Sequence, residues 1–383
     1  MKKIIIASIL LCLHGLLVAQ SQGNMTAVPE RPSPGDEIKI TYNPSRIPLK
    51  NSSVVSAIVY AYVNYRWQVL DLPLQKSGKS WQGKLKSSPE WGFFAVKFMA
   101  GDSIDNNNDQ GYGVMFYDKG RTAPGAYAGW GLLRSPSYGY GIPNYYKNFR
   151  ISDTATYFWM NQEISFHPNE ASVALSIPFA QSLLRYSGKN AMARLNNVIA
   201  FLTKKGTEDA LWRAHKVQLL AGPKEKADSL QAAIVQQFPN GNLAKLKAYQ
   251  AMQFEKDAAK KLVLSKEFLQ WFPEANASKE FDDANLIKYS TVYNNIVLMS
   301  DKESYAVMKQ YINELPYASV IFLYYKLIDI MHKRKDMPDA ELHPPSVMLF
   351  NRIEQFKSVV PNEYWYLSPK EWMQQIEKDM ASF

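Results

Sequence analysis

The apolar residues of the N-terminal third follow the pattern of β-strands. Short apolar runs, rich in Val, Ile, Tyr, Phe and Trp, are separated by turn residues such as Pro34-Gly35-Asp36 and Ser77-Gly78-Lys79. Such runs between turns are typical of antiparallel strands. The expected strands cover residues 38–42, 54–63, 68–72, 81–85, 93–99 and 114–117. They predict an immunoglobulin-like β-sandwich that has no disulfide.

After Ser152 the apolar spacing changes to about 3.6 residues, the period of an amphipathic helix. The pairs Phe238-Pro239 and Phe272-Pro273 stand 34 residues apart, and each closes an apolar helical pattern. This is the period of a tetratricopeptide-type helical hairpin. We therefore expect an array of helical hairpins, with an ordinary helical domain as the alternative. The expected helices cover residues 168–186, 191–204, 208–220, 224–238, 243–254, 258–272, 279–298, 302–313, 318–332, 346–358 and 369–380.

Between the two patterns, glycines alternate with aromatic residues. Because dense glycine disfavours regular structure, residues 120–151 are predicted to be a connection. The expected organisation is an α+β multidomain protein with a signal peptide at 1–19, a sandwich at 24–119, this connector at 120–151 and helical repeats at 152–383.

The N-terminus has the layout of a secretory signal peptide. Lys2 and Lys3 precede an apolar run that continues to Ala19, and the chain then becomes polar. We expect cleavage after Ala19 and a periplasmic or otherwise exported product, with an uncleaved anchor as the alternative. Cys12 is the only cysteine, so the mature chain would have no thiol and no disulfide. No later run has the length of a membrane span.

Charge is distributed unevenly along the chain. The formal net charge is +9, and residues 23–150 contain 15 Lys or Arg against 9 Asp or Glu. These cations are scattered through strand-like segments of an exported chain, so nucleic acid is not an expected partner. A solvated basic face is the favoured interpretation, and a preference for anionic surfaces or polysaccharides is the alternative.

One loop resembles a calcium-binding sequence. Asp105, Asn107 and Asp109 place oxygen ligands at alternate positions, but Gln110 replaces the usual glycine and Phe116 stands where an EF-hand has glutamate. A tight hairpin connection is the favoured interpretation, because Asn, Asp and Gly tolerate left-handed backbone angles. We therefore expect no metal and no cofactor.

The chain contains no HExxH, GxSxG, phosphate-loop or GxGxxG motif in a suitable context. We therefore expect a protein that is not an enzyme. A catalytic site assembled from residues far apart in the sequence stays open as an alternative. The favoured function is binding of a protein or peptide partner in the cell envelope by the helices between residues 208 and 298.

A second binding hypothesis concerns the aromatic side chains. Trp91, Trp130, Tyr138 and Tyr140 are candidates for stacking on a glycan, since flat rings bind sugars at low entropic cost. Packing of these rings against the sandwich is the favoured interpretation, and carbohydrate binding is the alternative function.

Several segments resemble a known family. They are Pro34–Pro44, Trp67–Leu72, Gly101-Asp102, Asp105-Asn106-Asn107, Gly111-Tyr112 and Gly125-Ala126-Tyr127-Ala128. Together they are similar to the N-terminal region of exported bacterial thioredoxin-like proteins of the TlpA type. The resemblance implies a signal peptide, an immunoglobulin-like domain and helical repeats before a C-terminal thioredoxin domain.

The chain lacks the residues with which this family carries out its chemistry. The family uses a Cys-x-x-Cys pair, and no cysteine follows Cys12. No catalytic residue can be carried over. The resemblance implies the non-catalytic half of a thiol-disulfide system, as a free-standing or truncated relative, with a separate thioredoxin-like protein as a natural partner.

Overall fold

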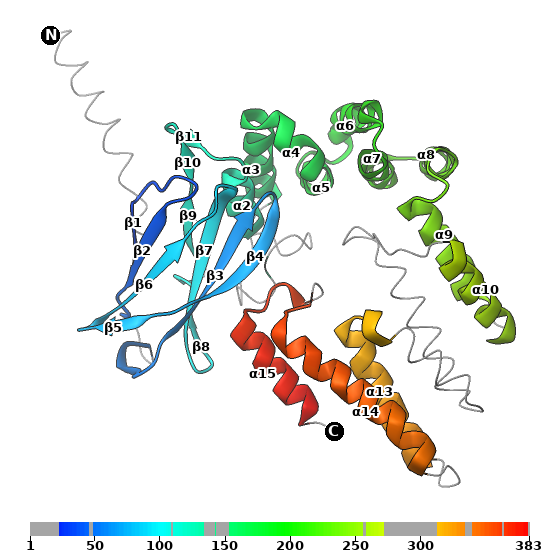
Figure 1. Cartoon of the computed structure of the whole chain (residues 1–383). Coiled ribbons are helices and arrows are strands. Elements are labelled where there is room, and N and C mark those ends of the chain that lie inside the picture. Colours follow the sequence, from blue (N-terminus) through cyan, green and yellow to red (C-terminus); the bar gives the residue numbers. More distant parts are fainter. Residues whose placement is uncertain are drawn as a thin grey trace. The chain divides into compact units, whose positions relative to one another are not determined.

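The computed structural model describes residues 23–45, 49–108, 110–133, 142, 153–255, 258–271, 312–333, 339–361 and 364–381 (Figure 1). The chain forms two compact units, Met1–Ile199 and Ala200–Phe383. The expected signal peptide, residues 1–19, lies outside the described residues. The sequence placed the start of the helical domain at residue 152, whereas the first unit also includes the helices up to residue 199.

The first unit begins with antiparallel sheets, drawn in blue and cyan in Figure 1. One sheet has the order β1-β2-β6-β5, and another has the order β4-β3-β7-β8, with β9 also paired to β7; β10 and β11 form a small ribbon. The strands are β1 (Met25–Val28), β2 (Glu37–Tyr42), β3 (Ser56–Val63), β4 (Arg66–Leu72), β5 (Gln75–Ser77), β6 (Ser80–Lys86), β7 (Trp91–Ala100), β8 (Ser103–Asp105), β9 (Tyr112–Met115), β10 (Tyr117–Asp118) and β11 (Arg121–Thr122).

The two larger sheets enclose one hydrophobic core. In β2 the buried residues Ile38, Ile40 and Tyr42 alternate with more exposed ones, as expected for a strand with one covered face. The ring of Tyr42 stacks on Phe98 of the other sheet, with their centroids 3.8 Å apart. Side chains from both sheets belong to the same buried cluster. Burial of this shared apolar surface is the main force holding the sheets together.

A helix covers the outer face of the sheet that contains β3 and β7 (Figure 1). This helix, α2 (Ala126–Leu133), lies in the segment that was predicted to be a connection without regular structure, and that prediction is wrong here. Its glycines serve close packing: a Cβ atom at Gly129 would lie 2.7 Å from the Cβ of Phe93. The remaining expected connector residues, apart from Ile142, lie outside the described part between 134 and 152.

Four further helices complete the first unit or cross its boundary: α3 (Asp153–Phe166), α4 (Pro168–Ala174), α5 (Ser176–Ser187) and α6 (Met192–Lys205). Helix α3 packs against α2 and α5. The sequence predicted one helix over 168–186, but the structure divides it at Leu175 into α4 and α5. The sequence also missed α3, whose apolar and polar residues are not separated onto opposite faces.

The second unit begins with four consecutive helices, each packed against the next: α7 (Glu208–Ala221), α8 (Lys224–Gln237), α9 (Asn242–Phe254) and α10 (Ala258–Trp271). All four match predicted helices. Helices α7 and α9 begin at residues 208 and 242, and helices α8 and α10 begin at 224 and 258, so both pairs are 34 residues apart. The predicted helices at 279–298 and, up to residue 311, at 302–313 lie outside the described residues.

Three C-terminal helices, α13 (Tyr317–Lys333), α14 (Asp339–Gln355) and α15 (Pro369–Met380), share a second core. The fully buried Tyr317 and Trp372 lie at its centre, with ring centroids 4.5 Å apart. Ser368 and Glu371 form a capping box at the start of α15. Helix α14 begins before the predicted residue 346, because it accommodates Pro344 and Pro345 within its length.

The described structure therefore combines β-sheets in the N-terminal part with a series of helices, which confirms the α+β class. Within the described residues, no helix has the length and apolar character needed to cross a bilayer.

Candidate functional site

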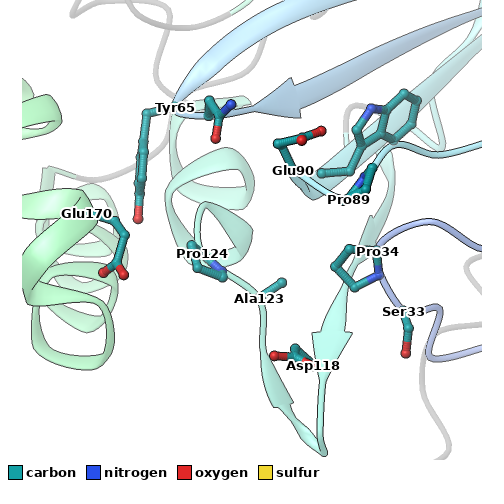
Figure 2. A pocket seen from close by; sticks show the side chains of 11 residues that line it. Ser33, Pro34, Tyr65, Pro89, Glu90, Asp118, Ala123, Pro124 and Glu170 are labelled. Carbon is teal, nitrogen blue, oxygen red and sulfur yellow. The ribbon is translucent and has the colours of Figure 1, made fainter.

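The first unit contains a pocket with a volume of about 640 Å³. Separate segments of the chain supply its walls: the approach to β2, the β3–β4 turn, the approach to β7, the β10–β11 region and helix α4. Figure 2 shows Tyr65 and Glu170 on one side of the opening and Pro34 and Asp118 on the other. The lining residues are Ser33, Pro34, Asn64, Tyr65, Pro89, Glu90, Trp91, Asp118, Ala123, Pro124 and Glu170.

The Tyr65 wall of the pocket is anchored by a buried carboxylate. Glu163 of α3 is fully buried, and its Oε1 accepts hydrogen bonds from the Tyr65 hydroxyl at 2.8 Å and the Gly125 N–H at 2.7 Å. Its Oε2 accepts from the N–H groups of Tyr127 and Ala128 at 3.0 and 3.1 Å. These N–H groups belong to the start of α2, where unpaired donors and the helix dipole favour a negative charge.

Tyr65 itself has an unusual backbone conformation. Asn64 and Tyr65 have φ angles of 48° and 59°, as a two-residue turn between right-handed twisted strands requires. A bulky residue rarely occupies this left-handed region. Burial raises the pKa of the Tyr65 hydroxyl, and the neighbouring Glu163 charge raises it further. The phenol therefore stays protonated and keeps donating to Glu163.

The charged groups that line the pocket are all acidic. Glu90, Asp118 and Glu170 are exposed, and no Lys or Arg is among the described lining residues. The Glu90 carboxylate accepts a hydrogen bond of 2.7 Å from the Ser88 hydroxyl. Across the described residues, no group of three His, Cys, Asp or Glu side chains is arranged to hold a metal ion.

The calcium candidates occupy a loop inside an edge strand. Strands β8 and β9 pair with successive parts of β7, so residues 106–111 interrupt one edge and do not connect a hairpin as predicted. Asn107 and Asn108 have φ angles of 61° and 56°, the left-handed angles that the sequence suggested. Asp109 lies outside the described residues.

Asp105 directs its oxygens to tyrosines of the core. Its Oδ2 accepts from the Tyr42 hydroxyl at 2.6 Å, and both of its oxygens lie within 3.1 Å of the Tyr112 hydroxyl. Its Oδ1 also accepts from the backbone N–H of Asn107 at 2.9 Å. Burial, followed by the bonds to Asp105, raises the pKa of Tyr42. These contacts give Asp105 a structural role in closing the loop onto the core.

The aromatic candidates for sugar stacking are not brought together at one open surface. Trp91 is 4 % exposed, and its ring packs against Phe94 and Phe116. Trp130 of α2 packs edge-to-face on Phe93, at a centroid distance of 5.9 Å, and on Trp159. Tyr138 and Tyr140 lie outside the described residues. For the two tryptophans the structure has the packing arrangement that the sequence favoured.

Helices α9 and α10 of the second unit expose large apolar side chains. Phe254 at the end of α9 is 80 % exposed, and Val263 and Trp271 of α10 are 54 % and 63 % exposed. A hydrophobic side chain on a helix is normally turned toward a core. We call these three exposed side chains of α9 and α10 the hairpin face.

Sequence reasoning missed the pocket and its anchor. Glu163 and Tyr65 are 98 residues apart in the sequence and belong to no motif. The Gly125-Ala126-Tyr127-Ala128 segment was noticed only for its family resemblance, and its N–H groups prove to be the donors to Glu163. The one available signal was a glutamate in a stretch rich in aromatic residues, Phe158 to Phe166.

Comparisons with protein-family models, with curated proteins and with solved structures found no match for this chain.

Proposed function

We propose that this chain is an exported, non-catalytic binding protein that holds a protein or peptide partner on tetratricopeptide-like helical hairpins. In this proposal the two facing sheets form an immunoglobulin-like domain that precedes the repeats. Stacked hairpins present extended surfaces for other molecules without supplying catalytic groups, so partner binding is the function that suits them.

The observation that carries the proposal is the repeat in α7–α10. Two pairs of residues that stand 34 positions apart have the same environment: Ala210 and Ala244 are both buried, and so are Ile234 and Phe268. Glu208 at the start of α7 also accepts a hydrogen bond from the backbone N–H of Asn242 at the start of α9. Equivalent burial and this contact between successive first helices support a repeated hairpin, not a chance spacing of two Phe-Pro pairs.

The hairpin face supports partner binding. Exposed aromatic residues are enriched among the side chains that dominate protein interfaces. Phe254 and Trp271 are both aromatic and both largely exposed. The resemblance to TlpA-type proteins suggests the class of partner: a separate envelope protein with the thioredoxin domain and the Cys-x-x-Cys pair that this chain lacks.

The test is site-specific photo-crosslinking in the native cell envelope. A photoreactive amino acid replaces Trp271 in one variant and Phe254 in another, and crosslinked products are identified by mass spectrometry. We expect both positions to give the same defined protein product. A product that contains a thioredoxin-like protein would assign the chain to a thiol-disulfide system.

The matched control places the photoreactive residue at Val54, which is 65 % exposed in the first unit. The same product at Val54 and at both helical positions, or no product from the helical positions, would contradict binding by the hairpin face.

A further inference from the structure

The pocket of the first unit has a chemical character that differs from its surroundings. Residues 23–150 contain more basic than acidic residues, 15 against 9. Nevertheless Glu90, Asp118 and Glu170 line the pocket, and no basic side chain is among its described lining residues. The acidic lining of the pocket therefore does not follow from the general charge of this region, which has the opposite sign.

The walls of the pocket are held in place before any ligand arrives. Pro34, Pro89 and Pro124 have restricted backbones. Tyr65 is tethered to Glu163, and the N–H of Gly125, next to Pro124, is bonded to the same carboxylate. The Asn64 N–H donates to the Glu90 carbonyl at 3.3 Å, which joins two walls directly. A preformed concave site loses less conformational entropy on binding than a flexible one.

The arrangement of the carboxylates selects the type of cation. They belong to the approach to β7, to β10 and to α4, and none of them is part of a metal-binding group in the described structure. A metal ion requires ligands that converge within a few ångströms. A larger organic cation can instead reach separated carboxylates while its carbon chain lies against the Tyr65 ring and the prolines. The volume of about 640 Å³ is in the range of small-ligand sites.

We propose that this pocket binds an organic cation, a guanidinium or ammonium group carried on an extended chain. The group lies between the Glu90, Asp118 and Glu170 carboxylates, with its aliphatic part against Tyr65. The source of the cation is either a free polyamine or an arginine side chain of a peptide. This site is independent of the hairpin face, which belongs to the second unit.

The experiment uses the whole chain and isothermal titration calorimetry with two probes, spermidine and the peptide acetyl-Gly-Arg-Gly-amide. The pocket variant combines Glu90→Gln, Asp118→Asn and Glu170→Gln. The control variant combines Asp71→Asn, Asp102→Asn and Glu225→Gln, which changes the net charge equally at exposed acids that do not line the pocket. We expect the pocket variant to bind the active probe about tenfold more weakly and the control variant to bind as the unmodified chain does.

The two probes distinguish the two sources of the cation. Binding of spermidine alone assigns a free polyamine, and binding of the arginine peptide alone assigns a peptide ligand. Equal weakening in the pocket and control variants would mean nonspecific attraction and would overturn the proposal. Absence of binding by both probes at millimolar concentration would overturn it too. Neither result affects the crosslinking test of the hairpin face, so the two proposals can fail separately.

Discussion

Glu163 shows how one buried charge joins segments of different secondary structure. Its carboxylate accepts four hydrogen bonds, from the β3–β4 turn, from the residue before α2 and from the first turn of α2. Hydrogen bonds to an ionised group are about twice as strong as neutral ones. The cost of burying the charge is thus offset by a complete set of donors. Tyr65 is the side chain through which this group also supports the pocket.

Replacement of Glu163 by Gln is expected to lower the free energy of unfolding of the first unit by about 3 kcal/mol. The amide has only one acceptor oxygen, and its NH₂ group faces N–H donors. Tyr65→Phe removes a single bond and is expected to cost about 1–2 kcal/mol. Urea denaturation followed by tryptophan fluorescence measures both. Equal effects of the two variants would mean that the helix N–H groups contribute little.

The packing of elements in this protein depends on glycines whose backbone lies close to a neighbouring aromatic side chain. Helix α2 lies on the sheet because Gly129 has no side chain at its contact with Phe93. Gly113 of β9 also leaves room for a neighbouring side chain, because a Cβ atom there would lie 2.7 Å from the Trp130 ring. The small helix residues and the large sheet residues are therefore complementary in shape.

Gly129→Ala is expected to destabilise the first unit by about 1–3 kcal/mol, although alanine is the better helix former. The added methyl group has to displace either the helix or Phe93. The matched control is Gly222→Ala at the end of α7, where the new Cβ meets only Gln218 at 3.5 Å. Thermal unfolding monitored by circular dichroism compares them. An unchanged or higher midpoint for Gly129→Ala would contradict tight packing of α2.

Helix α7 carries a histidine in a dry environment. His215 is 6 % exposed, and its Nδ1 has no hydrogen-bond partner among the residues that the structure describes. Burial lowers the pKa of His215, and the charge of Lys216 lowers it further; Lys247 acts in the same direction and Asp228 opposes it. The folded state therefore prefers the neutral imidazole.

This preference predicts a pH dependence of the stability of the second unit. Because the folded pKa is below the unfolded value of about 6.5, the unfolded chain binds more protons as the pH falls through this value. The stability that neutral His215 contributes to the second unit is thus fully present above about pH 7 and decreases as the pH falls toward 5. In the His215→Leu variant, the free energy of unfolding measured by urea denaturation is expected to fall less between pH 7 and pH 5 than in the unmodified chain. An identical pH profile for the variant and the unmodified chain would contradict it.

The whole chain consists of units with separate cores. The core shared by the two sheets belongs to the first unit, and the core around Tyr317 and Trp372 belongs to the second. Each contains large aromatic side chains that are fully buried. Units that have their own cores are able to unfold independently.

Calorimetry of the whole chain is therefore expected to show two unfolding transitions. Trp372→Ala removes a buried ring and its hydrogen bond to the Phe356 carbonyl. It should reduce the free energy of unfolding of the second unit by about 3–5 kcal/mol and so lower the midpoint of one transition. Glu163→Gln should lower the other. A single transition that both variants shift equally would show that the units unfold together.

Local sequence patterns were sufficient to predict the strands and helices whose buried residues recur at a regular spacing. Strand β2 alternates apolar and polar residues, and α7–α10 have apolar positions at helical spacing, so both were predicted closely. The capping box at Ser368 is a local feature of the same kind, because its interactions span only three residues.

The tertiary structure determined the remaining features, because they depend on contacts between distant segments. Helix α2 forms in a glycine-rich stretch since the sheet and Glu163 stabilise it from outside the segment. The loop at residues 106–111 was recognised as a turn, but its position within one edge strand follows from pairing with β7. The pocket combines residues from Ser33 to Glu170. Its acidic side chains are ordinary surface residues in the sequence, and only folding brings them to one opening.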